Sequence, residues 1–176
     1  MKNIFMLIIR PERKDDYAQI TLINNAAFEQ YNEGRLVENL RKNKKFIPQL
    51  SLVAMLGGRL VGHILFFPIK ILAGKSEHES IALAPVSVHP KHQKKGIGSA
   101  LIKEGLAQCK KESFQSVIVL GHPEYYPRFD FKPASNWKVS APFDVPDEAF
   151  MALELSENAL KNSRGVVQYP EEFNVV

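Results

Sequence analysis

An apolar run, a basic loop and an amphipathic helix follow one another in the middle of the chain. Residues 81–88 predict a strand, although Pro85 lacks the backbone N–H that a sheet ladder uses. Gly96 and Gly98 then open a helix with apolar residues at spacings of three and four. The amides of a helix N-terminus carry partial positive charge, and glycines let an anion approach them. With the lysines of residues 91–95 nearby, the segment predicts a phosphate or pyrophosphate site.

Two common phosphate loops do not match this segment. It lacks the Gly-Lys-Ser/Thr end of a P-loop, and it lacks the three-glycine dinucleotide fingerprint with its later acidic residue. Two glycines alone would also fit a helix cap beside a solvated basic loop. The strand ending Val86-Ser87-Val88-His89-Pro90 and the run Gln93-Lys94-Lys95-Gly96-Ile97-Gly98 favour the anion site instead.

The remaining pattern predicts one domain over residues 1–176. Helices are expected at residues 17–28, behind Asp15 and Asp16, and at 35–44; strands are expected at 5–10, 50–56, 59–67, 116–120 and 150–155. Gly57-Gly58 favours a hairpin, and residues 74–80 resemble a turn. Pro68 is expected to interrupt a strand, which residues 69–72 can continue past a bulge. The order β-α-α-β-β-β-α-β-α-β-β predicts an α/β domain with a mixed sheet.

The composition of the chain limits the classes of partner and the compartment that we expect for it. The chain has 176 residues, of which 45% are apolar and 24% charged, with a net charge of +4, as is usual for a soluble globular protein. No apolar run approaches the roughly 20 residues of a membrane span, and no signal peptide is expected. Cys109 is the single cysteine, which excludes an intrachain disulfide; we expect a cytoplasmic protein with no membrane partner.

Other binding classes are poorly supported. Lys42, Lys44 and Lys45 precede Phe46, but a solvated helix end explains them, so no nucleic-acid partner is expected. His89 and His92 lack an accompanying carboxylate or cysteine cluster, and no metal is predicted. Cys109 lies on the apolar face of its helix and is predicted to be a core residue.

The chain resembles the GNAT superfamily of N-acetyltransferases, and specifically a bacterial branch of it, over nearly its whole length. That family carries Gln/Arg-x-x-Gly-x-Gly/Ala after a strand ending in hydrophobic-x-Val-x-Pro, which residues 86–98 match in full. It often carries a tyrosine five residues before the phenylalanine of a Gly-Phe pair; Tyr126 and Phe131 match, with Asp130 in the glycine position. Branch-like segments also occur at residues 58–64, 119–129 and 150–155.

The resemblance implies a single-domain GNAT fold: a mixed, mostly antiparallel sheet with a splayed pair of parallel strands and helices on both faces. Acetyl-CoA, without a metal, would lie between the strands at 81–88 and 116–120. Val86 and Val88 would pair with its pantetheine arm, and loop amides would hold its pyrophosphate. The implied cofactor-binding residues are Val86, Ser87, Val88, Gln93, Lys94, Lys95, Gly96, Ile97, Gly98 and Ser99.

Acetyl transfer to an amine needs a base, an oxyanion donor and an acid for the leaving thiolate. The Val88 N–H could serve the oxyanion, and Tyr126 matches the family position of the acid, with Tyr125 as its competitor. His122 is the preferred base because imidazole has a suitable pKa. The alternatives are a water or one of Glu33, Glu38, His63 and Ser87.

The expected activity is therefore acetyl-CoA-dependent N-acetylation of a primary amine on a small molecule, peptide or protein, by direct attack of the amine on the thioester. The alternative is a GNAT-like module that binds acyl-CoA as a sensor without turnover. A homodimer with a second copy of the chain is a further candidate assembly.

Overall fold

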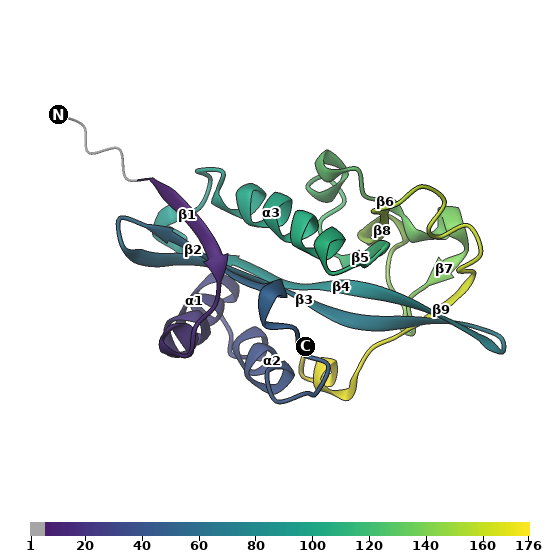
Figure 1. Cartoon of the computed structure of the whole chain (residues 1–176), viewed down its shortest axis with the longest axis horizontal. Helices are drawn as coiled ribbons and strands as arrows, with labels where there is room; N and C mark the ends of the chain where they lie inside the picture. Colours follow the sequence, from purple (N-terminus) through teal and green to yellow (C-terminus); the bar gives the residue numbers. More distant parts are fainter. Residues whose placement is uncertain (1–5) are drawn as a thin grey trace. The chain divides into compact units, whose positions relative to one another are not determined.

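The computed structural model describes residues 6–176, which form two compact units (Figure 1). The first unit comprises the residues up to 65, then 84–108 and 172–176; the second comprises 66–83 and 109–171. Two long strands, β3 (Arg59–Ala73) and β4 (Ser76–Val88), contribute residues to both units. Each unit is described by itself below.

The sheet of the first unit is antiparallel on its N-terminal side. β1 (Leu7–Pro11) pairs with β2 (Ser51–Leu56), and β2 pairs with β3. The turn between β2 and β3 is Gly57-Gly58, with φ of 57° and 76°. Positive φ at both positions is what a two-residue hairpin of this type requires, so the predicted hairpin is confirmed.

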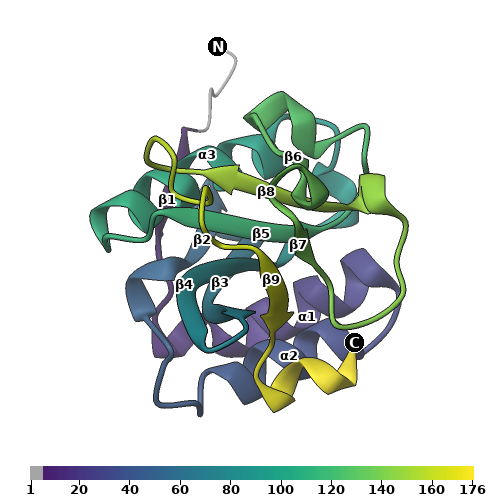
Figure 2. The ribbon, with the colours of Figure 1, turned by 90° about the vertical axis from the view of Figure 1, so that its right-hand side faces the viewer.

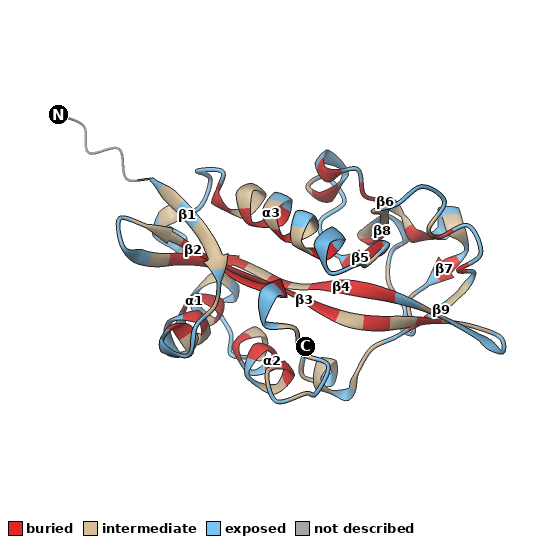
Figure 3. Cartoon of the chain, in the orientation of Figure 1, coloured by how far each residue is buried: buried red, intermediate tan, exposed pale blue. Residues whose placement is uncertain are grey.

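Helices cover both faces of this sheet. α1 (Tyr17–Phe28) and α2 (Asn32–Leu40) lie on one face, and α3 (Ile97–Lys111) begins on the other (Figures 1 and 2). Leu36, Val37 and Leu40 of α2 are buried, as are Ile20 and Ile23 of α1 (Figure 3). α2 begins and ends a few residues earlier than the predicted helix at 35–44. The buried stripe of each helix against the sheet supplies the apolar core of the unit.

The second unit adds the remaining strands. β5 (Ser116–Leu120) runs parallel to β4 through only two residue pairs, Ile81–Val117 and Ala82–Ile118. On its other side β5 pairs antiparallel with β8 (Phe150–Glu154) over its whole length (Figure 2).

Three short strands complete the second unit. β6 (Lys132–Pro133) pairs with β8; β9 (Gly165–Gln168) pairs antiparallel with β3 and parallel with β7 (Val139–Ser140). The mixed, mostly antiparallel sheet and the helices on both its faces confirm the predicted fold class.

Several expectations need correction. β1 begins at Leu7, and Phe5 of the predicted strand lies outside the described residues. β3 runs through Pro68, and β4 already starts at Ser76, so residues 76–80 are strand rather than turn. Residues 76–79 are polar because they are exposed or half-buried, whereas Ser80 is buried and donates to the Ser116 carbonyl at 3.1 Å. A proline is tolerated where its nitrogen faces no ladder partner.

The region after β5 also differs from the prediction. In place of the expected helix there is a four-residue 3-10 turn, Tyr126–Phe129. The short strands β6, β7 and β9 were not predicted, because pairs of two to four residues leave no period to detect. Over residues 6–176, no helix combines the length and apolarity needed to cross a membrane.

Candidate active site

The loop after β4 is held to the end of its strand by specific hydrogen bonds. The His89 N–H donates to the Val61 carbonyl at 2.8 Å, and the Gln93 side-chain amide donates to the Val88 carbonyl at 3.0 Å. Residues Pro90–His92 form a 3-10 turn, which His89 caps by accepting from the Lys91 N–H. Gln93, the glutamine of the family signature, therefore has a local structural role, because its side chain holds the loop against the end of β4.

The loop then enters α3 through two left-handed residues. Lys94 has φ of 60° and Gly96 has φ of 80°, and α3 begins at Ile97. The Ala100 N–H donates to the Gly96 carbonyl at 3.0 Å, so the residues before Ala100 form the N-terminal turn. A Cβ at Gly96 would meet no atom within 4 Å, which leaves the backbone there accessible to a ligand. We call residues 93–99 the cradle; Gly98 and Ser99 are half-buried in it, and Ile97 is buried.

The cradle lies in a positive electrostatic environment. Burial lowers the pKa of His92, and the charges of Lys95, His89, Arg59 and Lys91 lower it further. The Lys95 ammonium also donates to the Lys91 carbonyl at 3.1 Å, which holds one cation across the loop. This environment favours an anion and disfavours a protonated imidazole.

Gly62 allows α3 to approach the strands closely. A Cβ at this position would lie 3.0 Å from the Ser87 carbonyl oxygen and from Leu101, and 3.3 Å from Ile97. Ser87 is buried, and its hydroxyl has no hydrogen-bond partner among residues 6–176. An unpaired buried hydroxyl beside the cradle helix is available to a bound molecule.

Tyr126 lies in the second unit and is buried in an aromatic cluster. Its ring meets those of Tyr125 and Phe131 edge to face, at centroid distances of 5.3 and 5.7 Å. A Cβ at Gly121 would collide with the Tyr126 ring, so glycine at 121 permits this packing. Burial raises the pKa of the Tyr126 phenol above its ordinary value, and Tyr125 adds to the rise. The phenol therefore stays protonated at neutral pH.

The tyrosine turn ends in a left-handed residue at the position where the family often has glycine. Asp130 has φ of 68°, a conformation that glycine adopts freely and that aspartate tolerates better than most residues. The departure from the family pattern is thus compatible with the same turn.

His122 is exposed, and its carbonyl accepts from the N–H groups of Tyr125 and Tyr126, at 3.0 and 3.4 Å. Within the described chain its side chain makes no hydrogen bond or ion pair. Cys109 is buried, and burial raises its pKa to about 12, which confirms the predicted core position.

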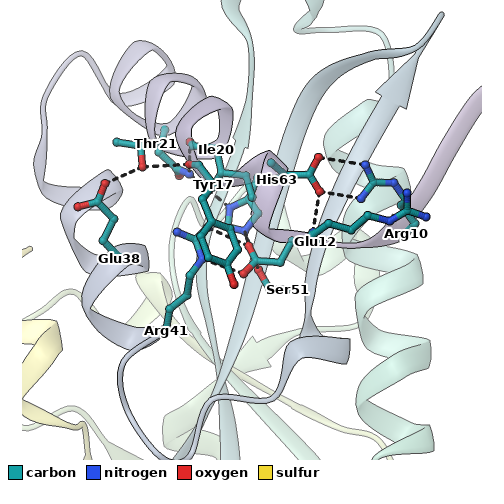
Figure 4. Close-up of polar contacts among 12 residues, drawn as sticks. Arg10, Glu12, Tyr17, Ile20, Thr21, Glu38, Arg41, Ser51 and His63 are labelled. Atoms are coloured by element: carbon teal, nitrogen blue, oxygen red, sulfur yellow. Dashed lines mark hydrogen bonds and ion pairs between the residues drawn. The ribbon is translucent and has the colours of Figure 1, made fainter.

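A buried polar network surrounds His63 in the first unit (Figure 4). The Arg41 guanidinium donates to both Glu12 carboxylate oxygens, at 2.8 and 2.9 Å, and lies 3.9 Å from the Tyr17 ring centroid. The Ser51 hydroxyl donates to Glu12 at 2.8 Å and lies 2.9 Å from His63 Nε2. His63 was among the candidate bases predicted from the sequence, but Glu12, Arg41 and Ser51 were not identified as its neighbours. The signal that could have indicated them is the occurrence of polar residues at strand positions that face the core.

The donors and acceptors fix the proton positions in this network. Because the Ser51 proton goes to the Glu12 carboxylate, His63 Nε2 must donate to Ser51, and Nδ1 accepts from Asn24 at 3.3 Å. Burial lowers the pKa of His63, which keeps the ring neutral. Burial alone would raise the pKa of Glu12, but the hydrogen bonds and the charge of the Arg41 guanidinium, with a smaller contribution from the neighbouring His63, bring it to about 2.

The other candidate bases are engaged locally. Glu38 accepts from the Thr21 hydroxyl at 2.8 Å, and Glu33 accepts from the Gln30 amide at 2.8 and 3.0 Å. His63 is fully buried and committed on both nitrogens. In residues 6–176, no three His, Cys, Asp or Glu side chains gather as a metal site would require.

Known proteins share both the sequence and the fold. The family model for the acetyltransferase (GNAT) domain matches residues 8–134. The uncharacterised N-acetyltransferase YjhQ of Escherichia coli K12 is 36% identical over 136 residues, 77% of this chain and 75% of that protein. YhbS of the same strain is 30% identical over 169 residues, 96% of this chain and 99% of that protein.

Two crystal structures extend the likeness. YhbS from Escherichia coli in complex with CoA superposes with a TM-score of 0.90 at 27% identity, covering 99% of this chain and 95% of that one. A GNAT family acetyltransferase from Brucella melitensis in complex with acetyl-CoA gives 0.78 at 34% identity, covering 96% and 99%. Because the family model matches most of the length of this chain, the chain belongs to the GNAT family of acetyltransferases.

Proposed function

We propose that the protein transfers the acetyl group of acetyl-CoA to a primary amine of a small molecule or protein. The observation that carries this proposal is the cradle: a left-handed Lys94 and Gly96 lead into a helix N-terminus surrounded by cations. The relatives with solved structures bind CoA and acetyl-CoA, and one of them is 34% identical to this chain.

The residues present fit this cosubstrate. Backbone amides of Lys94, Gly96 and Gly98 would hold the pyrophosphate, and the open space at Gly96 leaves room for it. Val86 and Val88 would pair with the pantetheine arm as an added strand does. The unpaired Ser87 hydroxyl supports a ligand along this part of β4.

The reaction would proceed by direct attack. The neutral amine nitrogen bonds to the thioester carbonyl carbon, and the Val88 N–H would stabilise the oxyanion. The C–S bond then breaks; the thiolate takes a proton from Tyr126, and the amine proton leaves to His122 or to a water. The buried, protonated Tyr126 phenol supports its assignment as the acid.

Paired glycine variants test the cradle. Gly96→Glu adds a negative charge where the pyrophosphate would bind, and calorimetry should show that acetyl-CoA binding is lost. Gly74→Glu is the matched control: Gly74 also has positive φ, 63°, and open space around its Cβ position. Both variants carry the same backbone strain and charge change, so equal affinities for acetyl-CoA would remove the cradle from the binding site.

Turnover separates the enzyme from a non-catalytic sensor of acyl-CoA. We expect steady release of CoA thiol with at least one member of a panel of amino acids, polyamines, aminoglycosides and peptides. Tight acetyl-CoA binding with no thiol release across the panel would favour the sensor instead.

A further inference from the structure

The second unit contains an open cavity that the proposed acetyl transfer does not use. Its volume is about 400 Å³, near the lower end of the range for small-molecule sites. It is lined by Trp137, Lys138 and Glu154 and, from the segment between β8 and β9, by Asn158, Lys161 and Arg164. A cavity of this size suits a metabolite rather than a macromolecular surface.

The charges in this cavity are unbalanced. Three exposed cations, Lys138, Lys161 and Arg164, line it together with one carboxylate, Glu154. That carboxylate accepts from the Leu160 N–H at 2.8 Å, so it already serves the local backbone. None of the three cations forms an ion pair with a carboxylate of the described chain. Positive charge gathered in a hollow without internal partners attracts an anion.

The backbone that carries these cations is anchored. The Gly165 N–H donates to the Lys138 carbonyl at 3.1 Å, and a Cβ at Gly165 would collide with the Leu72 backbone. This close approach holds Arg164 beside the start of β9. Because the scaffold is already formed, binding would need to order little more than the cationic side chains.

We propose that this cavity binds a small multivalent oxyanion, the phosphate or carboxylate groups of a metabolite. The Arg164 guanidinium offers a planar fork that matches such groups, and the two lysines add point charges. The Asn158 amide can donate a further hydrogen bond. The inference is independent of the proposed acetyl transfer, since no cradle residue takes part.

The single tryptophan of the chain lines the cavity and reports on it directly. The full-length protein would be titrated with pyrophosphate and with citrate at constant ionic strength, and Trp137 fluorescence should change saturably. Tighter binding of pyrophosphate would indicate that the natural ligand carries phosphate groups, and tighter binding of citrate would indicate that it carries carboxylates. Sodium chloride at the same ionic strength should not reproduce either response.

Charge variants test which residues bind the anion. Arg164→Gln and Lys161→Ala should each weaken the response about three- to tenfold. Glu154→Gln keeps an oxygen for the Leu160 N–H but removes a like charge, so it should strengthen binding. Lys75→Ala, at an exposed lysine in the β3–β4 turn, is the control and should match the parent protein.

Three results would overturn the proposal. One is the absence of a saturable change up to about 10 mM of either probe, confirmed by calorimetry. Another is an equal loss of anion affinity in Lys75→Ala and Arg164→Gln, which would indicate that the anions are attracted by the overall positive charge and not bound at this cavity. The third is displacement of pyrophosphate by CoA together with weakened CoA binding in Arg164→Gln, which would make the cavity part of the cosubstrate site.

Discussion

Tyr126 and Tyr125 are sequence neighbours with different chemical environments. Tyr126 is buried, and its burial raises the pKa of the phenol, so the phenol is protonated at neutral pH. Tyr125 is half-buried, and the Arg128 guanidinium lies 4.5 Å from its ring centroid. The two phenols can therefore be tested separately by matched substitutions.

We predict that Tyr126→Phe lowers turnover about 10²-fold while acetyl-CoA affinity barely changes, since the ring and its packing remain. The lower end of the usual range is expected because the raised phenol pKa makes transfer to a thiolate less favourable. Initial rates of thiol release with an accepted amine measure the effect.

Tyr125→Phe is the matched control and should stay within a few-fold of the parent rate. A loss in Tyr125→Phe with full activity in Tyr126→Phe would mean that the assignment is wrong by one residue. Because the Tyr126 pKa is raised, deprotonation of this group should not reduce the rate below about pH 10.

At the level of elements, the Glu12 network joins parts of the chain that are distant in sequence. Glu12 follows β1, Arg41 follows α2 as its C-cap, Ser51 begins β2 and His63 lies in β3. The Arg41 and Glu12 side chains are 7% and 2% exposed, so this ion pair is shielded from solvent. Breaking it leaves a buried charge without a partner.

Removing one partner should therefore cost more than removing both. We predict that Glu12→Gln and Arg41→Met each reduce the free energy of unfolding by about 3–5 kcal/mol. The double variant should recover part of that loss, since neither buried charge remains. Urea unfolding of the four proteins measures the coupling, and additive losses would show that the pair is not coupled.

The same network predicts acid sensitivity. Glu12 has a folded-state pKa of about 2 and an ordinary value of 4.5, so its stabilisation is present above pH 4.5 and is lost as the pH falls toward 2. The loss amounts to about 3 kcal/mol. His63 adds to it, because its pKa is lowered and its protonation below pH 6.5 favours the unfolded chain.

Denaturant unfolding between pH 7 and pH 3 tests this dependence. The stability difference between the parent protein and Glu12→Gln should shrink as the pH falls below 4.5. A difference that stays constant over this range would show that Glu12 is not held ionised by its neighbours.

At the level of the whole molecule, two compact units share three elements. β3, β4 and α3 each contribute residues to both. α3 is one continuous helix, with the cradle at its N-terminus and Cys109 near its C-terminus. A ligand bound at one end of a rigid helix stabilises the whole helix against unfolding.

The single cysteine makes this coupling measurable. Cys109 is buried with a raised pKa, so a maleimide should label it only when the structure opens. If the units open together, acetyl-CoA at 100 times its dissociation constant should slow labelling about 100-fold. Gly96→Glu should show no such protection, and an unchanged labelling rate in the parent protein would show that Cys109 opens independently of the cradle.

Local features were predictable from the sequence because they depend on residues a few positions apart. The hairpin at Gly57-Gly58, the helix at 17–28, the strand at 116–120 and the glycine loop leading into α3 all belong to this class. The family signature also rests on local spacing, since a phosphate-binding turn uses backbone amides close together in sequence. The strand positions 76–79 were predicted as a turn because their polar residues reflect exposure to solvent and not the absence of a strand.

Only the tertiary structure decided which residues meet across the chain. His63 contacts Ser51, 12 residues away, and Asn24, 39 residues away, and neither spacing repeats in a detectable period. The need for glycine at 62 and 121 likewise arises from Ser87 and Tyr126, which the fold brings against them. Sequence patterns encode the geometry of neighbours along the backbone, whereas burial, proton positions and cavities depend on which surfaces the folded chain places together.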